Sequence, residues 1–374
     1  MIYFDNAATS FPKPAHTVNE ATDCMLHWCG NPGRGAHALS RRAADRLFAC
    51  REALATLLGA SDPTRIVFLQ NTTMALNVAL KGLLRPGDHV LCSELEHNAV
   101  LRPLYALKAH GVDFDTFPVV GRTTEQILEG IRERRQKNTA AIVCLHTSNV
   151  CSIALPIAEI GTFCHENGLY FAVDAAQSAG HLAIDMEAAH IDLLAAPGHK
   201  GLLGLPGCGI LALRAGVHLS TIIEGGSGVN SLLHTMPEEM PERLEAGTLP
   251  VPAIAGLLGG LRFLSEIGIA EAQKRTQGLF LAARDRLETL PECHIYHRGA
   301  VGAVLLFNLG GIAPNDLARM LDREGIFVRA GLHCAPLAHK ALGTPKGGAV
   351  RLSFGVFNTV EELDALWRVL KSIL

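Results

Sequence analysis

The middle of the chain reads Tyr170-Phe-Ala-Val-Asp174-Ala-Ala-Gln177 and, further on, Leu193-Leu-Ala-Ala-Pro197-Gly-His199-Lys200. Each stretch begins with a short apolar run that predicts a buried strand, and each run is followed by polar residues. Asp174 ends the first predicted strand, and Lys200 follows the second. Ligands bind at the carboxyl ends of the strands in parallel α/β sheets. We therefore expect a functional site where these two strands end.

Similar runs occur on both sides of this stretch and alternate with helical segments. Predicted strands cover Ile66–Leu69, His89–Cys92, Ala141–His146, Tyr170–Asp174, Leu193–Ala196 and Gly209–Leu213. Predicted helices cover Ser40–Leu58, Thr73–Leu83 and Pro156–Asn167, with Ser40 as the N-cap of the first. Strand–helix alternation predicts an α/β fold, a mostly parallel sheet with helices on both faces.

The pattern changes after about Gly247. Val251–Ile267 predicts one long apolar connecting helix, and an α+β unit is expected from about Ala272. The strands of this unit are predicted at Val301–Asn308, Phe327–Arg329 and Val350–Ser353, and its last helix at Val360–Leu374. Glu224–Glu245 has no strong period and predicts a long ordered loop, which is often functional. We expect a large domain at 16–250, a connecting helix at 251–271 and a small domain at 272–374, with residues 1–15 packed nearby.

Composition narrows the class of protein. The 374 residues are 48% hydrophobic, enough for a large core and more than one small domain needs. The net charge of −3 argues against binding nucleic acid through phosphate neutralisation. No apolar segment long enough for a membrane span is visible, and the first residues lack the pattern of a signal peptide. Ten cysteines without a CxxC pair predict reduced thiols and no metal site. A cytoplasmic enzyme is expected.

The carboxylate and the amine after the two central strands suggest a specific chemistry. A lysine can form a Schiff base, and a buried carboxylate can pair with a heterocyclic nitrogen. Those are the two groups that pyridoxal 5'-phosphate chemistry requires. Taken alone, Lys200 is more often a surface residue and Asp174 more often a helix cap.

Motifs spread along the chain favour the first interpretation. From Tyr3-Phe-Asp-Asn-Ala-Ala8 to Arg351-Leu-Ser353, the sequence resembles the class V aminotransferase group of fold-type I pyridoxal-phosphate enzymes. Within that group it is most similar to the cysteine desulfurases and selenocysteine lyases of the SufS type (group II). The resemblance implies a large cofactor-binding domain with a mostly parallel seven-stranded sheet and a smaller C-terminal α+β domain.

The resemblance assigns roles around the cofactor ring. Lys200 corresponds to the lysine that binds the cofactor and moves the substrate's Cα proton. Asp174 corresponds to the partner of the pyridine nitrogen, and Gln177 to the partner of the phenolic oxygen. His97, in Glu96-His-Asn-Ala99, corresponds to a histidine that stacks on the ring and can shuttle a proton.

Other residues correspond to the phosphate cradle. Asn71, Thr72 and Thr73 follow a predicted strand and open a helix, whose N-terminus favours an anion. His199 resembles a further phosphate ligand. Thr248, in Arg243-Leu-Glu-Ala-Gly-Thr248, corresponds to a threonine that reaches the phosphate of the other subunit. The resemblance therefore implies a homodimer with shared active sites.

A third group concerns the substrate. Asn149 and Arg351 resemble the clamp for the substrate carboxylate, and a guanidinium suits a carboxylate. Arg34 and His37 match a segment that lines the same cleft. Cys334, in Arg329-Ala-Gly-Leu-His-Cys334, corresponds to the desulfurase nucleophile, in a loop where a thiolate can be exposed. The other nine cysteines are expected to be structural.

The implied reaction takes sulfur from L-cysteine as a persulfide on Cys334 and leaves L-alanine. The motif lacks the longer insertion of group I enzymes, which implies a short nucleophile loop and an acceptor protein. The resemblance implies that the transferred sulfur serves iron–sulfur cluster assembly. Alternatives on the same scaffold are a selenocysteine lyase acting on L-selenocysteine and another class V aminotransferase or β-lyase. A cofactor-binding scaffold protein without activity is the non-enzyme alternative.

Three positions depart from the family pattern. Pro197 stands where a serine or threonine usually helps to hold the phosphate, and proline offers neither a hydroxyl nor an N–H. Gly33 stands where a histidine usually precedes the arginine, and Pro250 replaces a common asparagine. Glu224-Gly-Gly-Ser-Gly228 and Met236-Pro-Glu-Glu-Met-Pro-Glu-Arg243 resemble a subgroup of desulfurase-like proteins, some members of which are thought to serve selenium metabolism.

Overall fold

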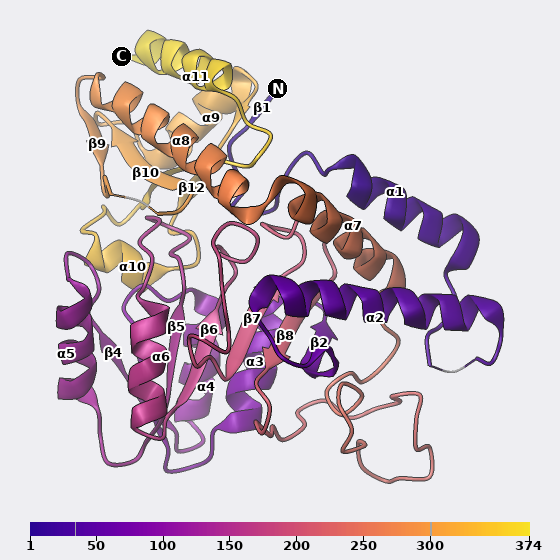
Figure 1. The fold of residues 1–374 in the computed structure, drawn as a ribbon. Helices are drawn as coiled ribbons and strands as arrows, with labels where there is room; N and C mark the ends of the chain where they lie inside the picture. Colours follow the sequence, from indigo (N-terminus) through magenta and orange to yellow (C-terminus); the bar gives the residue numbers. More distant parts are fainter. Residues whose placement is uncertain (34, 300) are drawn as a thin grey trace.

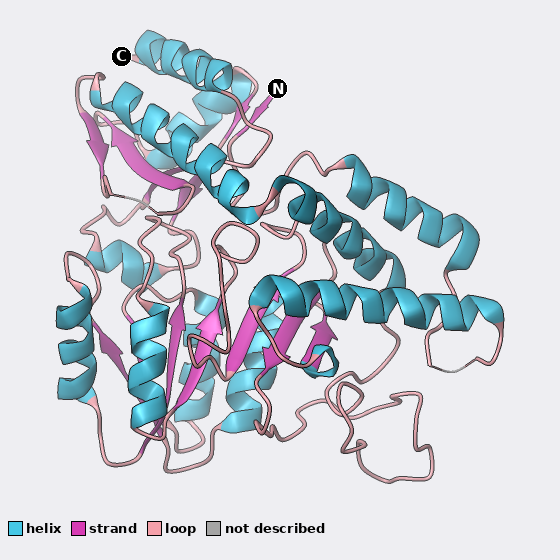
Figure 2. Ribbon diagram, in the orientation of Figure 1, coloured by secondary structure: helices cyan, strands magenta, loops and turns pink. Residues whose placement is uncertain are grey.

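A computed structural model describes residues 1–33, 35–299 and 301–374 (Figures 1 and 2). Its larger sheet has seven strands in the order β2-β8-β7-β6-β5-β3-β4. Their bounds are β2 Ile66–Leu69, β3 His89–Ser93, β4 Asp113–Phe117, β5 Thr139–Leu145, β6 Tyr170–Asp174, β7 Leu193–Pro197 and β8 Gly209–Leu213. β8 runs opposite to the other six strands and pairs antiparallel with both β2 and β7, and the remaining pairs are parallel. The expected mostly parallel sheet is confirmed.

Helices cover both faces of this sheet. One face packs on α3 (Thr72–Leu83) and α4 (Asn98–Lys108), and the other on α2 (Ala38–Leu58), α5 (Thr124–Arg134), α6 (Ile157–Glu166) and α7 (Val251–Ile267). Alternate residues of β5 serve the two cores: Ala141 and Val143 belong to the first, Ile142 and Cys144 to the second. Burial on both faces explains why these strands read as continuous apolar runs.

One strand of the larger sheet was missed, and the predicted N-cap of α2 was wrong. The strand β4 was not predicted, because Asp113-Phe-Asp115-Thr-Phe117 alternates acidic and apolar residues at an exposed sheet edge. Ser40 is not the cap of α2. That helix begins at Ala38, and His37 is the N-cap, with its Nδ1 accepting from the Ser40 N–H at 3.3 Å. The Ser40 hydroxyl instead donates to the carbonyl of Asn31 at 2.8 Å and holds the preceding loop.

A second layer of helices flanks the larger sheet. α1 (Ala15–Asp23) continues into a π-helical turn, Cys24–Trp28, and packs along α7, and a short 3-10 turn covers Pro63–Arg65. In Figure 1, α1, α2 and α7 lie together at one side of the molecule. The close approach requires glycine, because a Cβ on Gly259 of α7 would lie 2.3 Å from the carbonyl oxygen of His16.

The rest of the chain forms a smaller antiparallel sheet with its own core. The order is β12-β13-β10-β9, with β9 Cys293–Ile295, β10 Val304–Leu309, β12 Arg329–Gly331 and β13 Ala349–Ser353. It is flanked by α8 (Ile269–Glu288), α9 (Pro314–Arg323) and α11 (Val360–Ile373), and the short α10 (Pro336–Ala341) follows β12. The N-terminal β1 (Ile2–Tyr3) pairs with β11 (Ile326–Phe327). The predicted strand at Phe327–Arg329 is thus two strands, whereas the domain limits remain a prediction.

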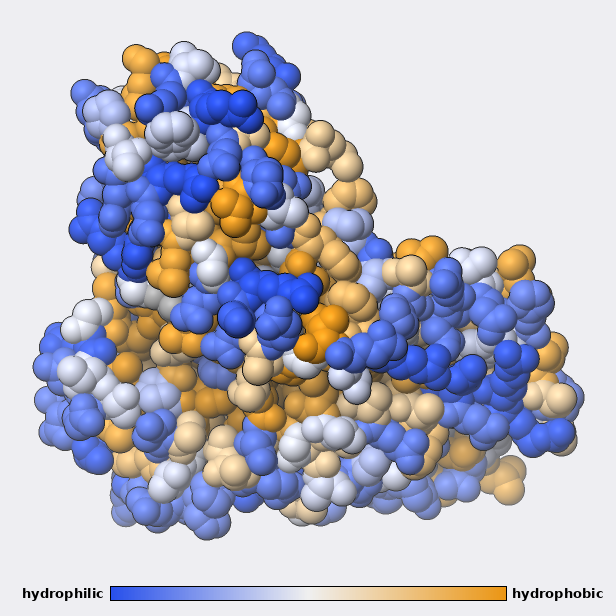
Figure 3. All heavy atoms as spheres, turned by 45° about the horizontal axis from the view of Figure 1, so that its top comes forward, coloured by the Kyte–Doolittle hydropathy of each residue, from blue (hydrophilic) through white to orange (hydrophobic). Residues whose placement is uncertain are grey.

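The surface and the loops complete the arrangement. Glu224–Glu245 contains neither helix nor strand and is the expected long loop. Figure 3 shows hydrophilic residues over much of one face, with hydrophobic residues gathered toward its middle. In the described residues no single helix is long and apolar enough to cross a membrane. The pair α7 and α8 reaches the required length and composition only together, across a bend of 85°.

Candidate functional site

A cavity opens at the carboxyl ends of the central strands, where the sequence predicts a site. Nine of the predicted residues line it. They come from the starts of α3 and α4 and from the segments after β5, β6 and β7: Asn71, Thr72, Thr73, His97, Asn149, Asp174, Gln177, His199 and Lys200. Residues far apart in the sequence therefore meet here, because parallel strands end at the same edge of the sheet.

Asp174 and Lys200 form the charged centre of the cavity. Asp174 is 4% exposed, and its Oδ1 accepts from the N–H of Ala176 at 2.9 Å. Burial raises its pKa, and the Lys200 ammonium opposes that effect. Burial also lowers the pKa of Lys200 to about 8, and the Arg351 and Arg329 cations act in the same direction. A lysine with this pKa supplies a substantial fraction of neutral, nucleophilic amine near neutral pH.

The start of α3 forms one wall and suits a phosphate group. Asn71 is the N-cap, and its Oδ1 accepts from the N–H of Met74 at 2.9 Å. In the described part of the chain, the buried atoms Thr72 Oγ1 and His199 Nδ1 have no hydrogen-bond partner. Unpaired buried polar atoms beside a helix N-terminus are the groups that an anion would satisfy. Pro197 lines the same wall and contributes no donor.

The pyridoxal phosphate that the sequence resemblance implies fits these residues. A carboxylate, a perturbed lysine and an anion-binding helix end surround one cavity. Gln177 is anchored by its Nε2, which donates to the carbonyl of Ala7 at 3.0 Å. The donor set therefore matches the pyridine nitrogen, aldehyde and phosphate of pyridoxal phosphate.

His97 is held in a defined orientation by its own helix. It is the N-cap of α4, and its Nδ1 accepts from the N–H of Ala99 at 3.0 Å. Burial lowers its pKa to about 4, with contributions from Lys200 and Arg351. The ring is therefore neutral at physiological pH and carries its proton on Nε2.

Glu96, which precedes His97, was not predicted as part of the site. Its side chain is fully buried and accepts from the Ser93 hydroxyl and from the N–H of Leu145. Burial raises its pKa to about 8, and the charge of Asp174 adds to this effect. Its place before His97 in the quoted motif gives no sign of this burial, so the sequence alone did not reveal it.

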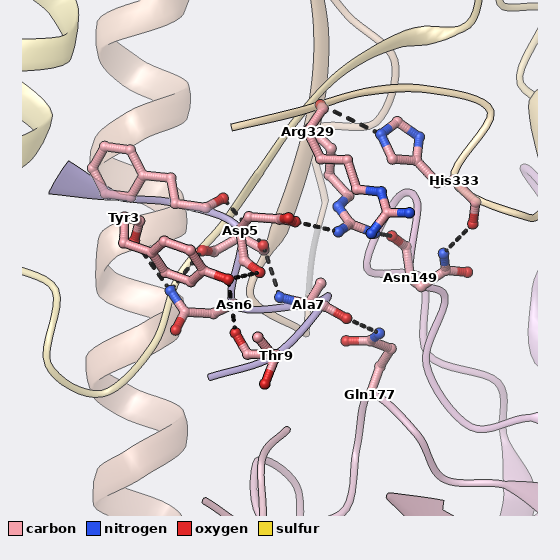
Figure 4. Close-up of polar contacts among 12 residues, drawn as sticks. Tyr3, Asp5, Asn6, Ala7, Thr9, Asn149, Gln177, Arg329 and His333 are labelled. Atoms are coloured by element: carbon pink, nitrogen blue, oxygen red, sulfur yellow. Dashed lines mark hydrogen bonds and ion pairs between the residues drawn. The ribbon is translucent and has the colours of Figure 1, made fainter. Parts of the chain in front are cut away.

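Arg351 lies beside the cavity, fixed by a carboxylate from the N-terminus. Its Nη2 contacts Asp5 Oδ1 at 2.6 Å, and its Nη1 donates to the carbonyl of Asn149 at 3.1 Å (Figure 4 labels Asp5 and Asn149). Arg351 is 2% exposed, and its Nε has no partner in the described residues. Asp5 is the second residue that sequence reasoning missed, although it stands in the quoted N-terminal motif.

Cys334 is exposed and follows β12, as expected. Its loop is docked against the cavity from two sides. The N–H of Asn98 donates to the carbonyl of Cys334 at 2.7 Å, and Asn149 Nδ2 donates to the carbonyl of His333 at 2.9 Å. All ten cysteines are free, and Cys29 is the only other exposed one. Within the described residues no cluster of His, Cys, Asp and Glu could hold a metal ion.

Thr248 and His37 do not line this cavity. Thr248 is exposed and lines a different cavity, together with Asn31 and Gly33 beside α2. Arg34 lies outside the described residues, and His37 serves as the cap of α2. Pro250 is the N-cap residue of α7. The substrate and phosphate roles that the sequence suggests for Arg34 and Thr248 therefore remain predictions.

Comparison with known proteins places the chain among relatives of the same length and fold. The aminotransferase class-V model matches residues 2–366. A probable cysteine desulfurase of Methanothermobacter thermautotrophicus is 34% identical, over 100% of this chain and 94% of that protein. A cysteine desulfurase of Escherichia coli is 30% identical, over 98% and 91%.

Solved structures agree with this result. The apo cysteine desulfurase of Thermococcus onnurineus has a TM-score of 0.90 at 30% identity, over 100% of this chain and 94% of that one. The cysteine desulfurase CsdA of Escherichia coli has the same score and identity, over 99% and 94%. With the cavity and its lysine in the expected place, these matches show that the chain belongs to the class-V aminotransferase family, as a full-length homologue of its cysteine desulfurases.

Proposed function

We propose that this chain is a pyridoxal-phosphate-dependent cysteine desulfurase that converts L-cysteine to L-alanine and stores the sulfur on Cys334. The observation that carries the proposal is the exposed Cys334 on a loop docked against the cavity that contains Lys200. An aminotransferase or a simple β-lyase has no need of a thiol at this place. The full-length similarity to proteins named cysteine desulfurase supports the same conclusion.

The residues present can divide the work of holding the cofactor. Asp174 would pair with the ring nitrogen, Gln177 with the phenolic oxygen, and Lys200 with the aldehyde carbon. The phosphate would lie against the start of α3, within reach of Thr72 and His199. Once bound, pyridoxal phosphate supplies an electron-withdrawing ring that stabilises negative charge at the substrate's Cα.

The chain's own residues then handle the amino acid. Arg351 and Asn149 bind the substrate carboxylate and orient the Cα–H bond toward the Lys200 amine, which removes the proton. The Cys334 thiolate forms a bond to the substrate sulfur as the Cβ–S bond breaks. Protons returned at Cβ and Cα complete alanine, and His97 can hold one of them at Nε2. In sum, one cysteine and one enzyme thiol give one alanine and one enzyme persulfide, with no external oxidant.

The proposal also covers the oligomeric state of the protein and the transfer of the sulfur to an acceptor. Thr248 lies outside the cavity of its own chain, which agrees with a role in the cavity of a second copy. We infer a homodimer with shared sites and an acceptor protein that collects the sulfur, with iron–sulfur cluster assembly as one destination. L-Selenocysteine is the substrate to compare.

The test is a paired assay on L-cysteine and L-selenocysteine that scores alanine together with sulfide or selenide. Cys334→Ala should lose activity on cysteine and keep its bound cofactor. Cys29→Ala, which removes the other exposed thiol, is the matched control and should behave as wild type. Retained cysteine activity in Cys334→Ala would refute the role of this thiol. Activity of the wild type on selenocysteine alone would favour a lyase, and a protein that stays colourless with added cofactor would favour a scaffold.

A further inference from the structure

Two buried histidines connect the short helix α10 to the loop that carries Cys334. His333 is 5% exposed and His339 is 2% exposed. The Nδ1 of His333 lies 3.1 Å from the Nε2 of His339, and the Nδ1 of His339 lies 2.9 Å from the Oγ1 of Thr344. At the other end, His333 Nε2 lies 3.4 Å from the carbonyl oxygen of Arg329, as Figure 4 shows. A continuous chain of polar contacts thus runs from Thr344 to β12.

The groups at the two ends fix the direction of donation along this series of hydrogen bonds. A carbonyl oxygen only accepts, so the Nε2 of His333 carries a hydrogen. Burial lowers the pKa of His333 to about 3 and that of His339 to about 4, so each ring is neutral with one N–H. The Nδ1 of His333 must then accept from His339 Nε2–H, which leaves the Nδ1 of His339 to accept from the Thr344 hydroxyl at 2.9 Å. The carbonyl oxygen of His339, at 3.2 Å, is a second acceptor near the same hydroxyl. The Arg329 carbonyl therefore sets the tautomers of both rings, and the Thr344 hydroxyl is the donor at the other end of this series of contacts.

The loop that carries Cys334 has an unfavourable backbone conformation, which contacts from other parts of the protein must hold. His333 and Cys334 have φ angles of 49° and 56°, in the left-handed region that is unfavourable for residues with a Cβ. Their carbonyls are held by Asn149 and Asn98 on the side of the larger sheet. The His333 ring supplies a side-chain anchor as well, through its contact with His339 of α10. An unfavourable conformation persists only where the surroundings determine it fully.

We propose that His339 and Thr344 are positioning residues for the nucleophile. They fix the His333 ring and so keep Cys334 in the conformation that presents its thiol to the substrate sulfur. Neither residue lines the cavity, so both act through His333. The inference rests on the proposed function, since it concerns the step that Cys334 performs.

The test compares two substitutions of Thr344. Thr344→Val removes the hydroxyl and keeps the shape of the side chain, whereas Thr344→Ser keeps the hydroxyl. Thr162→Val is the matched control, because Thr162 is an exposed residue of α6 whose hydroxyl donates to the carbonyl of Ala158. A second pair of variants replaces the His339 ring. The amide of Gln in His339→Gln can replace the Nε2 donor toward His333, and the shorter Asn in His339→Asn cannot.

Two measurements distinguish a displaced Cys334 loop from a general loss of activity. Hydrogen–deuterium exchange of the segment 331–339 should be faster in Thr344→Val and unchanged in Thr344→Ser and Thr162→Val. With L-cysteine in deuterated water, Thr344→Val should still exchange the Cα hydrogen, which depends on Lys200. Its rate of sulfur release should fall roughly 10- to 100-fold, the usual effect of a misplaced reacting group. Thr344→Ser should restore that rate, and His339→Gln should exceed His339→Asn.

Several results would overturn the proposal. One is equal sulfur release by Thr344→Val and Thr344→Ser, and another is a parallel fall of Cα exchange and sulfur release. If Thr344→Val does not fold, sulfur release by His339→Gln is compared with that by His339→Asn, and equal rates would overturn the proposal. A wild-type protein that releases no sulfur from cysteine would instead contradict the proposed function. The exchange measurement on the loop would still decide whether Thr344 and His339 hold it.

Discussion

At the scale of single residues, Lys200 is the group whose environment has the clearest consequence. Burial and nearby cations place its pKa at about 8 instead of 10.5, so neutral amine becomes abundant at lower pH than in an ordinary lysine. We expect cofactor-free protein to take up pyridoxal phosphate faster as the pH rises through about 8, measured by absorbance. Lys200→Ala should show neither this uptake nor any turnover. An increase centred above pH 10 would contradict the assigned environment.

The pKa of Glu96 is shifted upward, whereas that of Lys200 is shifted downward. Its folded-state pKa of about 8 lies above the ordinary value of 4.5, so between these pH values the folded protein keeps a proton that the unfolded chain has lost. The stabilisation from Glu96 is complete below about pH 4.5 and declines as the pH rises toward 8. Glu96→Gln cannot ionise, so its melting temperature should fall less than that of wild type between pH 5 and 8. Parallel pH profiles for the two proteins would show that Glu96 is ionised in the folded state.

Sequence reasoning located nine residues that line the cavity. It missed two carboxylates that contact the cavity's surroundings, Glu96 at Leu145 and Asp5 at Arg351. Asp174 and Lys200 were predictable because both follow recognisable strands, and Asn71 because it separates a strand from a helix. Asp5 was not predictable, since its partner Arg351 is 346 residues away along the chain. The role of Glu96 depends on full burial, and a lone acidic residue before a histidine gives no sign of burial.

At the scale of elements, the fold was predictable where strands are buried on both faces. β2, β6 and β8 have the predicted bounds, because apolar runs with sharp polar ends define them. β4 lies at the edge of the sheet, where charged residues alternate with apolar ones. The N-cap of α2 also depended on context, because the hydroxyl of Ser40 is engaged by the carbonyl of Asn31.

The contact between α1 and α7 makes a prediction at this scale. A Cβ on Gly259 would lie 2.3 Å from the backbone oxygen of His16, so Gly259→Ala must separate the two helices. We expect a loss of about 1–3 kcal/mol in the free energy of unfolding, as for other overpacked cores. Gly278 of α8 is the matched control, because a Cβ there meets nothing within 4 Å. Gly278→Ala should be neutral or stabilising by up to about 1 kcal/mol. Equal effects of the two substitutions in chemical unfolding would contradict the packing argument.

At the scale of the whole molecule, we predict a dimer, because Thr248 lines a second cavity and not the one that contains Lys200. The loop Glu224–Glu245 exposes Leu232 and Leu233, with exposed fractions of 96% and 54%, on the same loop that helps to line the cavity containing Thr248. Covering these two adjacent leucines in an interface would remove apolar surface from water and so favour association. We predict that light scattering gives twice the chain mass of 39.9 kDa. A double Leu232→Asp, Leu233→Asp variant should give monomers that hold the cofactor less tightly. Fully active monomers would contradict shared sites.

The central claim is that Cys334 accepts sulfur from cysteine. Its most direct test is mass spectrometry of the loaded protein after one turnover with L-cysteine and no acceptor. The account predicts one added sulfur atom on the peptide that contains Cys334, with one alanine formed for each sulfur bound. Alanine formed with no sulfur on Cys334, or with the sulfur on Cys29, would contradict it.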